Sequence, residues 1–183
     1  ADPRNDLREA RVEVARVEEL LNRSGRWSAE VMSGDNARAD DVISRLSDTD
    51  LFHYAGHARF AGDSGWRSEL ALAGDSRLEV SDILSLGRSP SMVVLSGCET
   101  AGARRNDSVT QFGLAHAFLA GGAEGVIATS RPVADRSAFL LVSEFYRSWA
   151  VGQPAHIAFN HAQQNLRTRH ADPDWAAFRL MEP

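Results

Sequence analysis

The chain has 183 residues, of which 43% are apolar and 25% charged, and this composition excludes general disorder. Its formal net charge is −5 and no block of basic residues stands out, which argues against a surface that binds nucleic acid directly. No apolar run approaches the length of a membrane span, so we expect no membrane partner.

Helical and extended segments alternate along the chain. Apolar residues at helical spacing predict a first helix over 5–23, which ends before Gly25. Short apolar runs predict strands, at 27–32, 50–56, 92–96, 125–129 and 175–181. Amphipathic segments predict further helices, at 36–47, 81–86, 108–120, 135–150 and 154–169. The glycine-containing stretch 58–80 is expected to form a hairpin or a loop excursion.

This alternation predicts the α/β class, with a mostly parallel sheet and helices on both of its faces. We expect residues 5–183 to form a single domain taken from a longer protein. Residues 1–4 are expected to be a cloning scar or a trimmed linker. In sheets of this kind the functional site forms outside the carboxyl ends of the strands.

Two reactive side chains follow predicted core strands. His57 comes just after DLFHYAG, and Cys98 comes just after MVVLSG. A thiolate is a strong nucleophile and a nearby imidazole can protonate a leaving amine, so a Cys and a His that meet in space can hydrolyse an acyl bond. On spacing alone the alternative stays open that Cys98 is a small buried hydrophobe and His57 a packed, hydrogen-bonded side chain.

Four segments carry a family resemblance, and they occur in order along nearly the whole chain. They are LFHYAGHARF, VVLSGCETAG, FGLAHAFLAGGAEGVIATSRPVADRSA and DPDWAAFRL. Together they resemble the CHAT domains, which belong to the caspase and separase group of cysteine proteases. The resemblance therefore implies a caspase-like three-layer sandwich.

The resemblance also assigns roles within the expected site. It implies that His57 is the acid/base partner and Cys98 the nucleophile of an endopeptidase that acts on a protein or peptide and needs no metal or other cofactor. The backbone amides of Cys98 and Ala58 would hold the oxyanion. The family usually has glycine at the position of Ala58.

Two further residues are candidates for the substrate pocket. Arg131 and Asp135 follow the strand expected at 125–129, in a region that lines the pocket in caspase-like enzymes. Arg131 stands where the family commonly has Trp and would favour an acidic substrate residue, whereas Asp135 matches an acidic position and would favour a basic one. The alternative is that one caps the next helix and the other is solvated.

His53, the other histidine near the predicted site, is given a structural role. His53 lies four residues before His57, but no Glu follows it as a zinc-binding HExxH motif requires, so we expect a buried, hydrogen-bonded side chain.

The wider role follows from composition and resemblance together. All twenty basic residues are arginine, which indicates a GC-rich, bacterial source, and the single cysteine favours a reducing, cytoplasmic setting. CHAT domains often follow a sensor or helical-repeat region, so the resemblance implies a regulated effector in signalling or defence. The alternatives are a catalytically silent interaction module of the same fold and a redox-sensing thiol protein, for which the chain has no resolving cysteine.

Overall fold

The computed structural model describes residues 7–59, 61, 65–97 and 113–183. Cys98, the expected nucleophile, lies outside the described residues.

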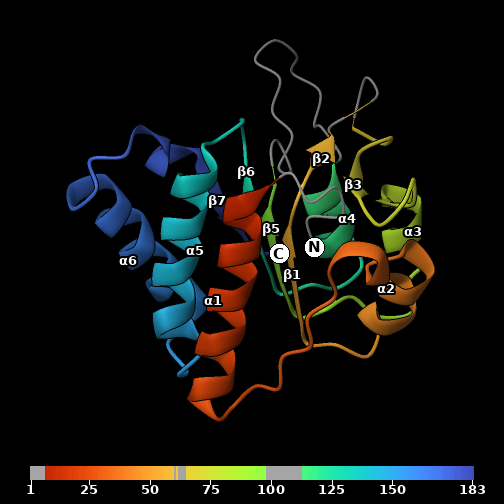
Figure 1. Cartoon of the computed structure of the whole chain (residues 1–183), viewed down its shortest axis with the longest axis horizontal. Coiled ribbons are helices and arrows are strands. Elements are labelled where there is room, and N and C mark those ends of the chain that lie inside the picture. The colour runs from red at the N-terminus through yellow and green to blue at the C-terminus, as the bar shows by residue number, and fades with distance from the viewer. Residues whose placement is uncertain (1–6, 60, 62–64, 98–112) are drawn as a thin grey trace.

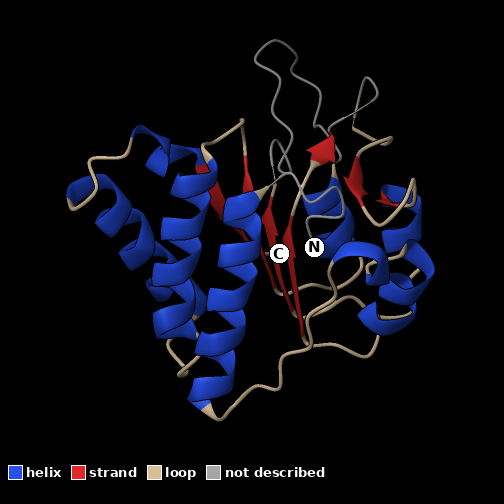
Figure 2. Cartoon of the chain, in the orientation of Figure 1, coloured by secondary structure: helices blue, strands red, loops and turns tan. Residues whose placement is uncertain are grey.

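A four-stranded sheet forms the middle layer of the molecule (Figures 1 and 2). Its strands, in spatial order, are β1 (Leu51–Ala55), β5 (Met92–Ser96), β6 (Gly125–Thr129) and β7 (Phe178–Met181). The first three are parallel and β7 runs antiparallel to β6. The mostly parallel sheet predicted from the sequence is therefore confirmed.

Helices cover both faces of this sheet (Figure 1). On one face lie α1 (Arg8–Ser24), α5 (Asp135–Trp149) and α6 (Ala155–Thr168); on the other lie α2 (Ala39–Leu46), α3 (Val80–Leu84) and α4 (Leu114–Ala120). Two short 3-10 helices, η1 (Gly34–Asn36) and η2 (Pro173–Ala177), complete the helical elements of the described residues. The arrangement is the expected three-layer sandwich.

The alternation of side chains along β5 shows why both faces must be covered. Met92 and Val94 belong to the core that α1, α5 and α6 share, whereas Val93 and Leu95 belong to the core beneath α2, α3 and α4. All four residues are 5% exposed or less. A strand buried on both faces has an unbroken apolar sequence, and MVVL is such a run.

The excursion expected at 58–80 is a small antiparallel sheet. It contains β2 (Ala58–Arg59), β3 (Glu69–Ala71) and β4 (Arg77–Glu79), with β3 in the middle. Because β2 begins one residue after His57, this sheet starts at the carboxyl end of β1. It therefore borders the edge where the site was predicted.

One predicted element is wrong: residues 27–32 form no strand. The apolar character of this segment is used instead for packing on the helical layer, where the ring of Trp27 stacks on Trp149 with a centroid distance of 4.8 Å. The Ala29 amide donates to the side-chain oxygen of Asn22 at 3.3 Å rather than to a strand partner.

Within the described ranges, no helix combines the length and apolar character needed to cross a bilayer.

Candidate functional site

The parallel pairing of β1 and β5 forms the sheet edge at which the site was predicted. Ala55 and Ser96 are Cα partners at the carboxyl ends of these strands, and the Gly56 amide donates to the Ser96 carbonyl at 3.4 Å. His57 follows Ala55 by two residues, and Cys98 follows Ser96 by two residues in the sequence. Both expected catalytic residues therefore continue from paired positions on neighbouring strands.

The backbone of His57 is held by groups of β1 and β3. Its carbonyl oxygen accepts a hydrogen bond from the Ala71 amide at 2.9 Å. The buried Tyr54 hydroxyl lies 2.7 Å from this oxygen and 2.8 Å from the Ala71 carbonyl oxygen. Its one proton is shared between these two acceptors. The His57 residue itself is only partly buried. A fixed backbone with an accessible residue suits a side chain that must meet a substrate.

Gly56 makes this arrangement sterically possible. A Cβ atom at this position would lie 2.6 Å from the Tyr54 hydroxyl oxygen, which is far inside van der Waals contact. Glycine therefore allows the tyrosine to pass beneath the chain on its way to the His57 carbonyl.

Ala58, the expected oxyanion donor, lies opposite Leu70 in the β2–β3 pair. Hydrogen-bonded and non-hydrogen-bonded residue pairs alternate in an antiparallel ladder. The hydrogen bond from the Ala71 amide to the His57 carbonyl makes His57–Ala71 a hydrogen-bonded pair, so Ala58–Leu70 is a non-hydrogen-bonded pair. The Ala58 N–H consequently points away from β3. Ala58 has no positive φ, so alanine costs no left-handed strain where the family usually has glycine.

The neighbouring strand β6 holds the residue that precedes Cys98. The hydroxyl of Thr129, at the end of β6, donates to the Gly97 carbonyl at 2.9 Å, and Thr129 is fully buried.

A buried polar cluster lies on the α1 side of the same strand ends; we call its members, Glu13, His53, Ser96 and Tyr146, the Glu13 cluster. Nε2 of His53 is 3.0 Å from Oε1 of Glu13, and the Ser96 hydroxyl donates to Oε2 of Glu13 at 3.0 Å. Nδ1 of His53 is 3.2 Å from the Tyr146 hydroxyl. The expectation that His53 is buried and hydrogen-bonded is therefore confirmed, and its side chain is 8% exposed.

Proton positions in the Glu13 cluster follow from its chemistry. Burial, and secondarily the charge of Glu13, raises the pKa of Tyr146 well above its ordinary value, so its hydroxyl keeps its proton. An ionised carboxylate only accepts hydrogen bonds, so Nε2 of His53 donates to Glu13.

The two pocket candidates lie after β6, both exposed. Arg131 donates to Oδ1 of Asp174 at 2.6 Å and to the carbonyls of Pro173 and Pro132, each at 3.2 Å. Asp135 stands in the first turn of α5, where a negative charge is favoured by the helix dipole. The structure therefore places Arg131 against η2 and Asp135 at the start of α5.

Asp174 joins η2 to the start of α5. Its Oδ2 accepts from the Ala134 amide at 3.0 Å. The Ser137 hydroxyl shares its one proton between this oxygen, at 3.2 Å, and Oδ2 of Asp172, at 2.7 Å. Burial raises the pKa of Asp174, but these hydrogen bonds and that from Arg131 outweigh it, so the net pKa lies below the ordinary value.

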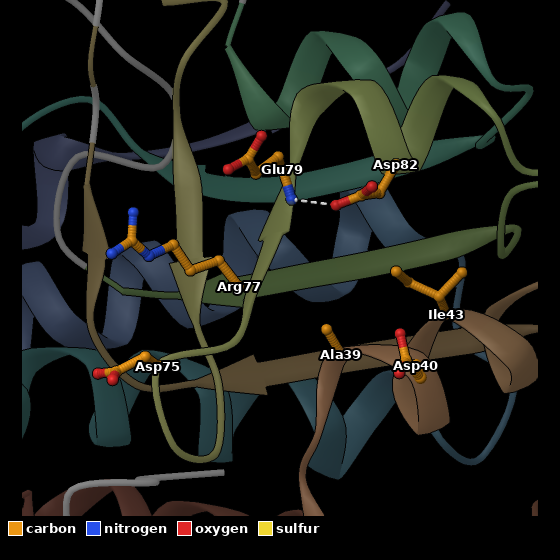
Figure 3. A pocket seen from close by; sticks show the side chains of 7 residues that line it. All are labelled: Ala39, Asp40, Ile43, Asp75, Arg77, Glu79 and Asp82. Atoms are coloured by element: carbon orange, nitrogen blue, oxygen red, sulfur yellow. Dashed lines mark hydrogen bonds between the residues drawn. The ribbon is translucent and has the colours of Figure 1, made fainter.

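A separate hollow lies between α2 and the β4–α3 segment (Figure 3). Its lining residues are mostly acidic: Ala39, Asp40, Ile43, Asp75, Arg77, Glu79 and Asp82. The one hydrogen bond drawn there runs from the Glu79 amide to Oδ2 of Asp82 at 2.8 Å and caps α3. This hollow contains no nucleophile or histidine, and none of its lining residues belongs to the strand-end site.

Sequence reasoning missed several residues that support the strand-end site: Glu13, Tyr54, Ser96 and Thr129. One signal for Glu13 exists, because it follows Ala10 by three residues and precedes Val17 by four, on the buried stripe of α1. A carboxylate on an apolar stripe predicts a buried polar partner. Nothing comparable distinguishes Thr129, since threonine is common in strands.

Comparison with solved structures identifies the class of fold. The Arg-specific cysteine proteinase gingipain R (RgpB) superimposes with a TM-score of 0.68 at 12% sequence identity, covering 93% of this chain and 41% of its own. The complex of Porphyromonas gingivalis RgpB pro- and mature domains gives 0.69 at 12% identity, covering 91% and 40%. The chain thus has a caspase-like protease fold and spans about two fifths of the gingipain chains.

The family of the chain can be stated more narrowly than its fold. The CHAT domain model matches residues 2–182, so the chain belongs to the CHAT domain family, as its four motifs indicated. No curated protein matches it.

Proposed function

We propose that the chain is a cysteine endopeptidase in which Cys98 is the nucleophile and His57 its acid/base partner. One observation carries the proposal: Ala55 and Ser96 are register partners at the carboxyl ends of β1 and β5, and in the sequence His57 and Cys98 each follow one of them by two residues. Membership of the CHAT family and a fold shared with cysteine proteases support it.

The proposed reaction uses ordinary thiol chemistry. The Cys98 thiol gives its proton to His57, and its sulfur forms a bond to the scissile carbonyl carbon. The carbonyl oxygen takes up the negative charge between the amides of Cys98 and Ala58. His57 then protonates the departing amine as the carbon–nitrogen bond breaks. Water, deprotonated by His57, attacks the thioester and releases the acid product with the thiol restored. The outward N–H of Ala58 suits the oxyanion role.

We further propose a cellular role for this activity, as a regulated effector in bacterial signalling or defence that acts in the cytoplasm on a protein substrate. A sensor or helical-repeat region in the full-length protein would control it. The family membership supports this role.

The test combines labelling with cleavage. Because Cys98 is the only cysteine, a peptide chloromethyl ketone should attach once, and competing peptides should slow its attachment. Iodoacetamide, which needs no peptide site, serves as the control reagent. Cleavage of a peptide library should accompany labelling and disappear in Cys98→Ala. A thiol that iodoacetamide modifies but peptide reagents do not, in a protein that cleaves no peptide, would favour a catalytically silent module instead.

A further inference from the structure

The Glu13 cluster connects four separate elements directly beneath the strand-end site. Glu13 comes from α1, His53 from β1, Ser96 from β5 and Tyr146 from α5. The carboxylate of Glu13 bonds to both β1 and β5, at 3.0 Å in each case. It therefore bridges the two strands that lead to His57 and Cys98.

Burying the carboxylate of Glu13 costs free energy that an apolar side chain would not cost. Glu13 is 2% exposed, and a buried ionised group must recover the free energy of its lost hydration through hydrogen bonds. An apolar residue would pack the same stripe of α1 at less cost, as Val17 and Leu21 do.

The contact with Ser96 indicates what the carboxylate achieves. Ser96 is the last residue of β5, its backbone carbonyl accepts from Gly56, and its hydroxyl binds Glu13. Side chain and main chain of one residue are thus fixed at once, two positions before Cys98. On the β1 side, His53 is held between Glu13 and Tyr146, four positions before His57.

We propose that Glu13 is a positioning residue, which clamps the carboxyl ends of β1 and β5 from α1 and so sets the relative placement of His57 and Cys98. The inference rests on the proposed function, because it concerns the geometry of that dyad. If Glu13 sets this geometry, the reactivity of the Cys98 thiol depends on the packing of α1 against the sheet.

Alkylation of Cys98 measures dyad geometry without a known substrate. An imidazole close to a thiol favours the thiolate near neutral pH, whereas any accessible thiol is ionised at high pH. The ratio of iodoacetamide rates at pH 7 and pH 9.5 therefore reports the dyad and cancels accessibility. His57→Ala gives the ratio of a thiol without its partner.

The informative variants are Glu13→Ala, Glu13→Gln and Ser96→Ala, with Glu19→Ala as the matched control on α1. Glu19 pairs with Arg16 and Arg23 of the same helix, and its side chain is 39% exposed. We expect Glu13→Ala and Ser96→Ala to lower the ratio at least fivefold. Glu13→Gln keeps one acceptor, for the Ser96 hydroxyl, but places an amide N–H2 opposite Nε2 of His53, so it should lower the ratio less than Glu13→Ala. Glu19→Ala should stay within twofold of the original protein.

The outcomes separate this inference from the function on which it rests. If His57→Ala leaves the ratio unchanged, the dyad itself is refuted and the positioning role falls with it. If His57→Ala lowers the ratio but Ser96→Ala does not, the dyad stands and the clamp is overturned. Thermal unfolding identifies variants that fail to fold; should Glu13→Ala be one, Ser96→Ala, a smaller change, decides. A lower melting temperature with an unchanged ratio means a structural role only.

Discussion

The Thr129 hydroxyl donates to the carbonyl oxygen of Gly97 across the β5–β6 boundary, at 2.9 Å and fully buried. Gly97 immediately precedes Cys98 in the sequence. The chain that leads to the expected nucleophile is therefore held from β6 by Thr129, from β1 by the Gly56 amide and from α1 by Glu13.

Thr129→Val should weaken this hold without changing the shape of the side chain. The Gly97 carbonyl would lose this donor inside the protein, which costs about 1–3 kcal/mol of folding free energy. We expect a lower melting temperature and a loss of kcat that exceeds any change in KM. Thr168→Val is the control, since that hydroxyl bonds a carbonyl on the exposed side of α6. Equal effects of both substitutions would contradict a specific role for Thr129.

Replacing either member of the proposed dyad should abolish cleavage and leave the fold intact. Cys98→Ala removes the nucleophile and His57→Ala removes the proton donor for the leaving amine. His53→Gln is the contrasting variant: its side chain lies in the Glu13 cluster, so it should lower the melting temperature more than turnover. Residual cleavage near the original rate in either dyad variant would exclude the dyad. Circular dichroism checks that each variant folds.

The core strands could be predicted from the sequence because each is a short apolar run. Residues 92–96 and 125–129 are β5 and β6 with the bounds expected. A parallel strand that is buried on both faces needs an unbroken apolar run. Few other elements of four to eight residues show such a run, so the pattern indicates a core strand. The segment 27–32 has a similar apolar content but lies outside the sheet, because Trp27 finds its partner in Trp149. Local pattern does not reveal which layer a segment will join.

The support of the site was less predictable than the site candidates themselves. His57 and Cys98 are recognised from neighbouring residues in the chain, whereas the contact between Ser96 and Glu13 spans 83 positions. The spacing of α1 does place Glu13 on the buried stripe with Val17 and Leu21, but it does not show which groups the carboxylate binds. Buried hydrogen bonds of this kind depend on tertiary packing, which spacing along one element does not encode.

Asp174 should contribute to stability in a pH-dependent way. Its pKa is lowered in the folded state, so its contribution is complete above the ordinary value of about 3.9 and is lost as the pH falls through the folded value. We expect Asp174→Asn to lower the free energy of unfolding by about 2 kcal/mol at pH 7, since it weakens hydrogen bonds to a charged group. The deficit should shrink as the pH falls below about 4.

Chemical denaturation of both proteins between pH 3 and pH 7 measures this difference. Asp35→Asn, at an exposed residue of η1, is the control and should show little deficit at any pH. A deficit for Asp174→Asn that stays constant across this range would mean that the carboxylate charge contributes nothing.

Substrate preference should depend on Asp135 rather than Arg131. The guanidinium of Arg131 is already engaged by Asp174 and two carbonyls, so taking up an acidic substrate side chain would compete with those bonds. The exposed carboxylate of Asp135 can pair with a basic side chain, and a substrate lacking that charge would leave it unpaired. We therefore expect cleavage after Arg or Lys, reduced about tenfold in kcat/KM by Asp135→Ala, equivalent to 1.4 kcal/mol.

Peptide profiling of the original protein, Asp135→Ala and Arg131→Ala measures this preference. Cleavage after acidic residues that collapses only in Arg131→Ala would reverse the assignment, and a preference unchanged in both variants would mean that neither side chain lines the pocket.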